Sequence, residues 1–159
     1  ALIATICTFT IDIMKGFIPV VVSTKYGLPL SMSLLIGTFA VIGHIFPIFH
    51  HFRGGKGMAT ALGVLCGISY KLAIANAIVW ISTFWLVRIA SVSSIISVLT
   101  MPLLFLLNNK MFYLTPGVIL ICMFLLYKHL SNIYILTTQT YHEYKASFVH
   151  YVHKLFTFC

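Results

Sequence analysis

The sequence predicts an all-α fold, a polytopic transmembrane helix bundle of about six membrane segments. Hydrophobic residues make up 60% of its 159 residues and charged residues only 8%. A soluble domain carries about 25% charged residues, so this chain has too little polar surface to cover a globule in water. Its mean hydropathy of +1.05 agrees with an integral membrane protein.

The apolar residues fall into runs of the length that membrane helices require, roughly 20 residues at 1.5 Å each. These runs cover residues 2–22, 29–47, 58–87, 91–107 and 113–128. The third would be about 45 Å long as one helix, whereas the hydrocarbon core is about 30 Å thick. It is also interrupted at residues 67–71, Gly-Ile-Ser-Tyr-Lys. Division into helices at 57–69 and 72–87 gives six segments.

Loop charges favour six segments over five, which would leave no clear bias. With six segments, one side of the membrane holds Arg53, Lys56, Arg88, Lys128, Lys145 and Lys154. The other side holds Lys25, Lys71 and Lys110. The side richer in Lys and Arg is normally cytoplasmic. We therefore expect the 50–57 loop, the region around Arg88 and the C-terminal tail to share the cytoplasmic face.

The chain shows no internal repeat or linker, which indicates a single integral membrane domain over residues 1–159. It opens inside an apolar run without a basic leader, so we expect further sequence before Ala1. Residues 144–156 have the pattern of an amphipathic helix at the membrane interface, or of a frayed terminus. The oligomeric state does not follow from the sequence.

The net charge of +8 arises from ten Lys and Arg against two acids. The basic residues are scattered between apolar runs and form no face for a nucleic acid duplex. We expect no nucleic acid partner, but membrane lipid and phosphorylated substrates.

A glycine-rich loop carries the clearest chemical signal. Gly54, Gly55 and Gly57 allow the backbone to approach a ligand closely, and the next helix begins near Lys56. Its free N–H groups, with the side chains of Lys56 and Arg53, would form a phosphate site. Glycine follows Lys56 where a nucleotide-binding P-loop has Ser or Thr. The alternative is a basic turn that obeys the positive-inside rule.

Three histidines, His44, His50 and His51, lie in the same region. The nearby sequence supplies no carboxylate and only one His-His pair, which is too little for a di-iron site. We therefore predict no metal and no cofactor.

The segment Gly43–Thr60, GHIFPIFHHFRGGKGMAT, resembles the second signature of the acyl-phosphate-dependent glycerol-3-phosphate acyltransferases, the PlsY family. Three further stretches are similar to family motifs and follow in family order: Asp12–Gly16 (DxxKG), Arg88–Ser94 (RYxSLxS) and Lys128–Ile133 (HxxNI). The family's first helix and its SGNxGATN loop have no counterpart. The third signature also departs after Asn132, with Ile135, Gln139 and Tyr141 where the family has Arg, Gly and Glu.

The resemblance implies a multi-pass enzyme of the bacterial inner membrane with a cytoplasmic active face. Such an enzyme transfers a fatty acyl group from acyl phosphate to glycerol 3-phosphate, giving lysophosphatidate without metal or coenzyme A. His129, Asn132 and Lys56 would then be catalytic. The implied substrate-binding residues are His44, Arg53, Gly54, Gly55, Lys56, Gly57, Arg88, Ser91 and Ser94. The HxxxxD motif of other glycerolipid acyltransferases is absent.

Several of these residues also have structural interpretations. Asp12 and Lys15 form an i, i+3 ion pair that lowers the cost of charge in lipid, which we favour over a catalytic role. Ser91 and Ser94, expected on one helical side with Arg88, can serve helix packing, and His129 can cap a helix end. For the whole chain, the alternatives to an acyltransferase are a membrane anion carrier and an inactive remnant of the enzyme.

Overall fold

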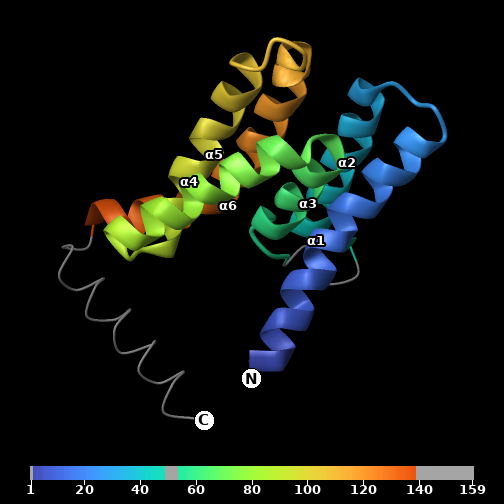
Figure 1. Cartoon of the computed structure of the whole chain (residues 1–159). Coiled ribbons are helices and arrows are strands. Elements are labelled where there is room, and N and C mark those ends of the chain that lie inside the picture. The colour runs from blue at the N-terminus through green and yellow to red at the C-terminus, as the bar shows by residue number, and fades with distance from the viewer. Residues whose placement is uncertain (1, 49–53, 139–159) are drawn as a thin grey trace.

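The computed structural model describes residues 2–48 and 54–138, and these residues form an all-helical fold (Figure 1). Its elements in chain order are α1 (Leu2–Lys25), α2 (Leu30–Ile45), α3 (Met58–Ile68), α4 (Tyr70–Val87), α5 (Ala90–Leu106), the short 3-10 helix η2 (Phe112–Leu114) and α6 (Thr115–Thr138). The predicted all-α bundle with six main segments is confirmed. The tail at 144–156 and Arg53 lie outside the described residues.

Within the described part of the chain, three segments are long and apolar enough to cross a membrane: Leu2–Lys25, Tyr70–Val87 and Phe112–Leu136. Helices α2, α3 and α5 are apolar but shorter. Large apolar side chains cover the outside of the bundle, for example Leu86 at 84% and Ile3 at 79% exposure. An apolar exterior of this extent is suited to lipid rather than water. The chain is therefore built as an integral membrane protein.

The long apolar run at 58–87 is broken where the sequence predicted a break. Helix α3 ends at Ile68, and Ser69 takes an extended conformation (φ −159°, ψ 106°) before α4 begins at Tyr70. The expected start at residue 72 was two residues late, because Tyr70 and Lys71 form the first turn of α4. With 11 residues, α3 is only about 16 Å long. It reaches halfway into a bilayer and carries its N-terminal loop at one end of the bundle.

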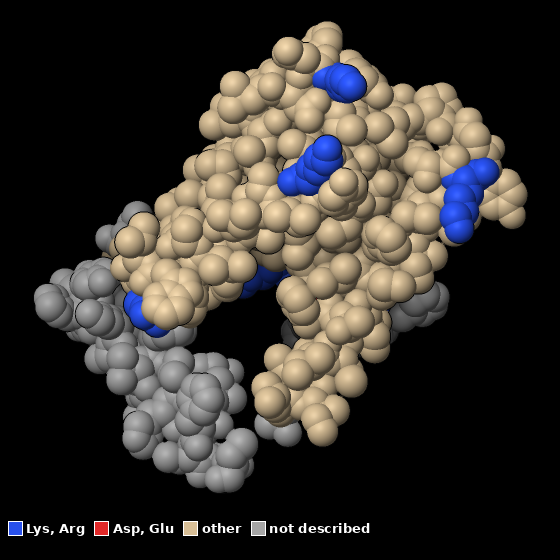
Figure 2. Space-filling model, in the orientation of Figure 1, with Lys and Arg blue, Asp and Glu red and all other residues tan. Residues whose placement is uncertain are grey.

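The connections alternate between the two ends of the bundle (Figure 1). The α2–α3 connection, the α4–α5 turn and the end of α6 lie at one end, with the α1–α2 and α5–α6 connections at the opposite end. Loop charges predicted one shared side for the 50–57 loop, the region around Arg88 and the C-terminal tail. The structure places residues 54–57 and Arg88 at one end, and the tail lies outside the described residues. Figure 2 shows Lys and Arg as separate patches on an otherwise uncharged face, with some basic atoms inside a hollow at the first end.

Glycines allow α1 and α3 to pack with their backbones in contact. A Cβ on Gly63 would overlap the carbonyl oxygen of Ile13, and one on Gly16 would overlap that of Thr60. Gly67 follows Gly63 by one turn and packs on Val20. This is the close packing that small residues four apart permit in membrane helices. The contact fixes the start of α3 beside the middle of α1.

Buried hydrogen bonds join α4 to α5. Asn76 donates to the backbone carbonyl of Ser97 at 2.9 Å, and the Ser97 hydroxyl donates back to Asn76 Oδ1 at 2.9 Å. One turn closer to the α4–α5 connection, Trp80 Nε1 donates to Ser94 Oγ at 3.1 Å. These bonds satisfy polar groups that would otherwise be unpaired in the bundle.

Candidate functional site

The glycine-rich loop at 54–57 lies directly on the C-terminal end of α2. A Cβ on Gly54 would overlap the carbonyl oxygen of His44, and one on Gly55 would overlap Nε2 of the His44 imidazole. Gly57 has a left-handed conformation with φ +80°, which disfavours any residue with a side chain. The loop can approach α2 this closely only because these three positions lack side chains.

Helix α3 starts from this loop with its N-terminus uncapped by any side chain. Gly57 is the N-cap, and its carbonyl accepts the first helical hydrogen bond from Ala61 at 2.8 Å. The N–H groups of Met58, Ala59 and Thr60 therefore have no carbonyl within the helix to bind. The helix begins at Met58, one residue later than the predicted start at 57, because Gly57 takes a left-handed conformation. These donors and the helix dipole favour an anion.

Lys56 and His129 lie together at this end of the bundle, although they come from the loop and from α6. The charge of Lys56 acts on the His129 imidazole. Part of the Lys56 side chain stays exposed, and partial burial of its ammonium lowers its pKa. The sequence-based prediction required these two residues on one side of the membrane, and they lie at the same end of the bundle.

The imidazole of His129 is buried and incompletely bonded. Only 1% of this residue is exposed. Its Nδ1 lies 3.4 Å from the Asn132 amide Nδ2, whereas its Nε2 has no hydrogen-bond partner among the described residues. Leaving a buried polar atom unpaired costs about 1–3 kcal/mol. Because an amide N–H can only donate, Asn132 favours the tautomer in which His129 Nε2 carries the proton. His129 therefore holds a buried donor without a partner among the described residues, in a ring on which the charge of Lys56 acts.

Asp12 of α1 contacts His44, the residue on which the loop packs. Asp12 Oδ1 lies 2.8 Å from Lys15 Nζ, so the ion pair within α1 predicted from the sequence is confirmed. The same oxygen lies 3.5 Å from His44 Nδ1, a contact between α1 and α2 that sequence reasoning missed. Lys128 also acts on His44, and its Nζ lies 5.3 Å from the centroid of the Phe46 ring. This places α6 against the end of α2.

Arg88, Ser91 and Ser94 were expected on one helical side, and the structure corrects this for Arg88. A left-handed conformation at Arg88 (φ 59°) ends α4, so Arg88 belongs to the turn and precedes α5. Its guanidinium lies 4.6 Å from the centroid of the Trp85 ring. Ser91 and Ser94 are both buried on α5, where Ser94 accepts the hydrogen bond from Trp80.

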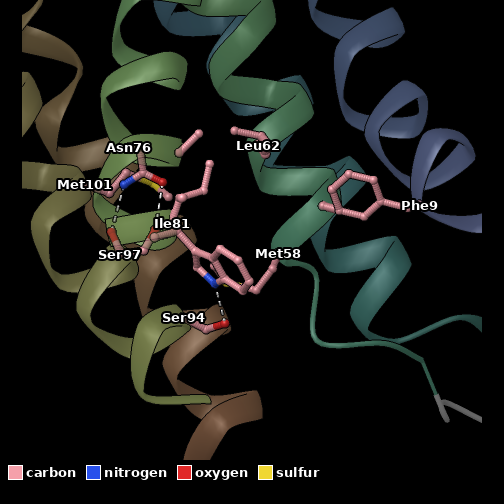
Figure 3. A pocket seen from close by; sticks show the side chains of 11 residues that line it. Phe9, Met58, Leu62, Asn76, Ile81, Ser94, Ser97 and Met101 are labelled. Carbon is pink, nitrogen blue, oxygen red and sulfur yellow. Dashed lines mark hydrogen bonds between the residues drawn. The ribbon is translucent and has the colours of Figure 1, made fainter. Parts of the chain in front are cut away.

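An apolar cavity of about 340 Å³ opens beside the loop. Met58, which follows Gly57, lines it together with Phe9, Leu62, Trp80, Ile81 and Met101. Figure 3 shows Phe9, Met58 and Leu62 on the α1 and α3 side, and Asn76, Ser97 and Met101 on the other. Sequence reasoning did not find this cavity, since its lining comes from four helices and only two of its apolar residues, Met58 and Ala59, fall within a motif. The available signal was the presence of Asn76 and Trp80, one helical turn apart, in an otherwise apolar run. Both side chains carry an N–H donor that needs a partner inside the bundle.

The described residues contain no group of three or more His, Cys, Asp or Glu that could hold a metal ion. His50, His51 and Arg53 lie outside the part of the chain that the structure describes. The absence of a metal from the reaction stays a prediction.

The comparisons with known proteins agree with one another. A family profile described as glycerol-3-phosphate acyltransferase matches residues 2–139. The glycerol-3-phosphate acyltransferase of Albidiferax ferrireducens is 38% identical over 139 residues, covering 82% of this chain and 62% of that protein. The enzyme of the same name from Haemophilus ducreyi is 41% identical over 131 residues, covering 82% of this chain and 65% of its own length. The chain thus spans less than two thirds of these relatives.

Two solved structures share the fold. Crystal structures of PlsY, an integral membrane glycerol 3-phosphate acyltransferase, are 33% identical to 84% of this chain. The lysophosphatidic acid form has a TM-score of 0.79 with 68% of its chain covered, and the glycerol 3-phosphate form 0.78 with 67% covered. Profile, sequence and fold therefore lead to one conclusion: this chain belongs to the glycerol-3-phosphate acyltransferase family.

Proposed function

We propose that this chain transfers a fatty acyl group from acyl phosphate to glycerol 3-phosphate, giving lysophosphatidate and inorganic phosphate. One observation carries the proposal. The charge of Lys56 acts on the buried His129, whose Nε2 has no partner among the described residues, and Met58 at the end of the same loop lines an apolar cavity. A positively charged loop with free N–H donors beside an apolar cavity suits a substrate with a phosphate head and a fatty chain.

The phosphoryl group is held by the loop. The N–H groups at the start of α3 and the ammonium of Lys56 face oxygen atoms that carry negative charge. The glycines Gly54, Gly55 and Gly57 contribute by leaving the backbone accessible, and Arg53 adds a second cation. Support for this assignment comes from the resemblance to PlsY, one of whose structures is a glycerol 3-phosphate form.

His129 acts as a hydrogen-bond donor in this proposal. With Asn132 on its Nδ1, the imidazole presents Nε2–H to a phosphoryl oxygen or to the oxyanion that forms at the acyl carbon. The imidazole of His44 supports the loop by packing against Gly55. Arg88, Ser91 and Ser94 complete the site on the α4–α5 side, where Ser94 borders the acyl cavity.

The reaction requires positioning more than a covalent intermediate. The glycerol 3-phosphate hydroxyl oxygen forms the new ester bond to the acyl carbon, the bond from that carbon to the phosphate oxygen breaks, and phosphate leaves with the electron pair. Acyl phosphate already has a good leaving group, so alignment and charge stabilisation account for most of the catalysis. The leaving phosphate takes up the hydroxyl proton in the balanced reaction.

The membrane location follows the same proposal. We place residues 1–159 in the bacterial inner membrane as one domain, with the 54–57 loop, Arg88 and the end of α6 at the cytoplasmic face. The excess of basic residues that the sequence assigns to this side supports that orientation. Of those six residues the structure describes Lys56, Arg88 and Lys128. Glycerol 3-phosphate then arrives from the water and acyl phosphate from the surrounding lipid, and no metal or cofactor takes part.

The test is to express the chain in membrane vesicles and to supply palmitoyl phosphate with radiolabelled glycerol 3-phosphate. Labelled lysophosphatidate that disappears in Lys56→Ala supports the enzyme. The matched control is Lys71→Ala, which removes an exposed lysine at the start of α4 and should leave the product unchanged. Label that enters sealed vesicles without product would indicate an anion carrier instead. Neither product nor uptake in correctly inserted protein would contradict the proposal and indicate an inactive remnant.

A further inference from the structure

We propose that Asp12 is a positioning residue, which fixes the Gly55–Lys56 backbone by orienting the imidazole of His44. This inference deepens the proposed function, because the backbone concerned carries the phosphate-binding loop. Asp12 does not itself reach the place where Lys56 and His129 meet. It acts from α1, through a side chain of α2, on the loop.

The contacts form a continuous chain across three segments. Asp12 Oδ1 lies 3.5 Å from His44 Nδ1, and both side chains are mostly buried, at 17% and 13% exposure. On the opposite edge of the same ring, Nε2 faces Gly55 so closely that a Cβ there would overlap it. Gly54 meanwhile packs on the His44 backbone carbonyl. His44 thus contacts Asp12 with one nitrogen and the loop with the other.

The carboxylate determines which nitrogen carries the proton. A negative oxygen beside Nδ1 stabilises a proton at that position, which leaves Nε2 as a lone pair facing Gly55. A proton on Nε2 would instead occupy the narrow space beside Gly55, which has no room for a Cβ. Lys15 and Lys128 are the other charged groups that act on this ring. Both are cations and cannot accept a bond from Nδ1–H, so of these three groups only Asp12 can set the tautomer.

A purely structural ion pair does not account for the contact. Lys15 already pairs with Asp12 within α1 at 2.8 Å, and that pair would balance the carboxylate without His44. Asp12 is also the one acidic residue that the structure describes, and it lies at the end of the bundle where the phosphate-binding loop is. The two partners of Asp12 can be separated experimentally, because removing Lys15 leaves the contact to His44 intact.

The first test reads the tautomer directly and does not depend on activity. The chain is prepared in lipid nanodiscs with ¹⁵N-labelled histidine, and the His44 signal is assigned by its loss in His44→Gln. We expect His44 to be protonated on Nδ1 in the wild type and in Lys15→Leu. In Asp12→Leu the proton should move to Nε2. Asp12→Asn, whose amide oxygen still accepts a hydrogen bond, should keep most of the wild-type tautomer.

The second test measures the effect on the loop. In Asp12→Leu the KM for glycerol 3-phosphate should rise about tenfold, as expected for a modest displacement of a binding group, while Asp12→Asn recovers most of that loss. An unchanged tautomer and unchanged KM in Asp12→Leu would overturn the proposal, as would an equal shift of the His44 tautomer in Lys15→Leu. A wild-type chain that makes no lysophosphatidate would contradict the proposed function alone, since the tautomer measurement still decides the role of Asp12.

Discussion

Substitution of Gly55 by alanine tests the site most directly, because it introduces one methyl group at the closest contact of the loop. The added Cβ would overlap His44 Nε2 and lie against the rest of the imidazole. The ring cannot move away easily, because it is mostly buried and its Nδ1 contacts Asp12. The loop must therefore move, and Lys56 moves with it.

The size of the effect follows from that displacement. Ordinary van der Waals contact between the new methyl and the ring requires a separation larger by on the order of 1 Å. A misplacement of about 1 Å in a binding group can lower the rate about 100-fold, which corresponds to about 2.7 kcal/mol of lost transition-state stabilisation. We therefore expect kcat/KM of Gly55→Ala to fall by about two orders of magnitude, without loss of folding or membrane insertion.

The assay measures initial rates of lysophosphatidate formation in vesicles that contain equal amounts of inserted protein. Gly43→Ala is the matched control, because a Cβ at this position of α2 meets nothing within 4 Å. It should keep wild-type activity, and alanine should even favour the helix by about 0.5–1 kcal/mol. If Gly55→Ala retains activity within about threefold of Gly43→Ala, the loop does not depend on its contact with His44, and the reasoning is refuted.

Three further outcomes are expected. Because burial lowers the pKa of Lys56, the charge that binds phosphate is lost as pH rises, at a lower pH than for an ordinary lysine with a pKa of about 10.4. A pH–rate profile should show this loss as a decline in kcat/KM. Lys56→Arg stays charged, so the decline should move to higher pH. A decline at the same pH in Lys56→Arg would exclude Lys56 as the cause of the decline. Ser97→Ala leaves Asn76 Oδ1 without its donor. The free energy of unfolding in SDS titrations should fall by about 1 kcal/mol. An unchanged value would show that the hydrogen bond from Ser97 to Asn76 does not stabilise the bundle. Gly63→Ala should lower the free energy of unfolding in detergent by about 1–3 kcal/mol, because its methyl overlaps a backbone carbonyl of α1. Gly43→Ala should cause no such loss. Equal stability of the two variants would argue against close α1–α3 packing.

The helices were largely predictable from the sequence because membrane helices are defined by local properties. Length and hydropathy identify a span within one segment, and the break at Ser69 showed itself as a polar interruption in a run too long for the bilayer. Loop charges then predicted which loops share a side, since lysine and arginine are more frequent in cytoplasmic loops than in loops on the opposite side. The predicted helix starts at 57 and 72 were wrong by one and two residues, because the conformation of the preceding residue sets the start. The apolar run at 113–128 underestimated α6, which continues to Thr138.

Arg88 was misplaced for a related reason. Its spacing to Ser91 and Ser94 matches one helical side, but spacing assumes a continuous helix. The left-handed conformation of Arg88 ends α4 and turns the chain into α5. A non-glycine residue in this conformation is uncommon, so no residue pattern pointed to it. The turn became visible only with the backbone.

The sequence by itself determined that the chain lies in a membrane and which segments are helical, because composition and periodicity are local. It also predicted which residues bind phosphate, from the GGKG motif. Only the tertiary structure decided which of those residues meet. It brought His129 of α6 to Lys56, Asp12 of α1 to His44, and side chains of four helices to one cavity. These contacts depend on how helices cross, and crossing is set by the packing of small and large side chains between helices far apart in the chain. No single segment contains that information.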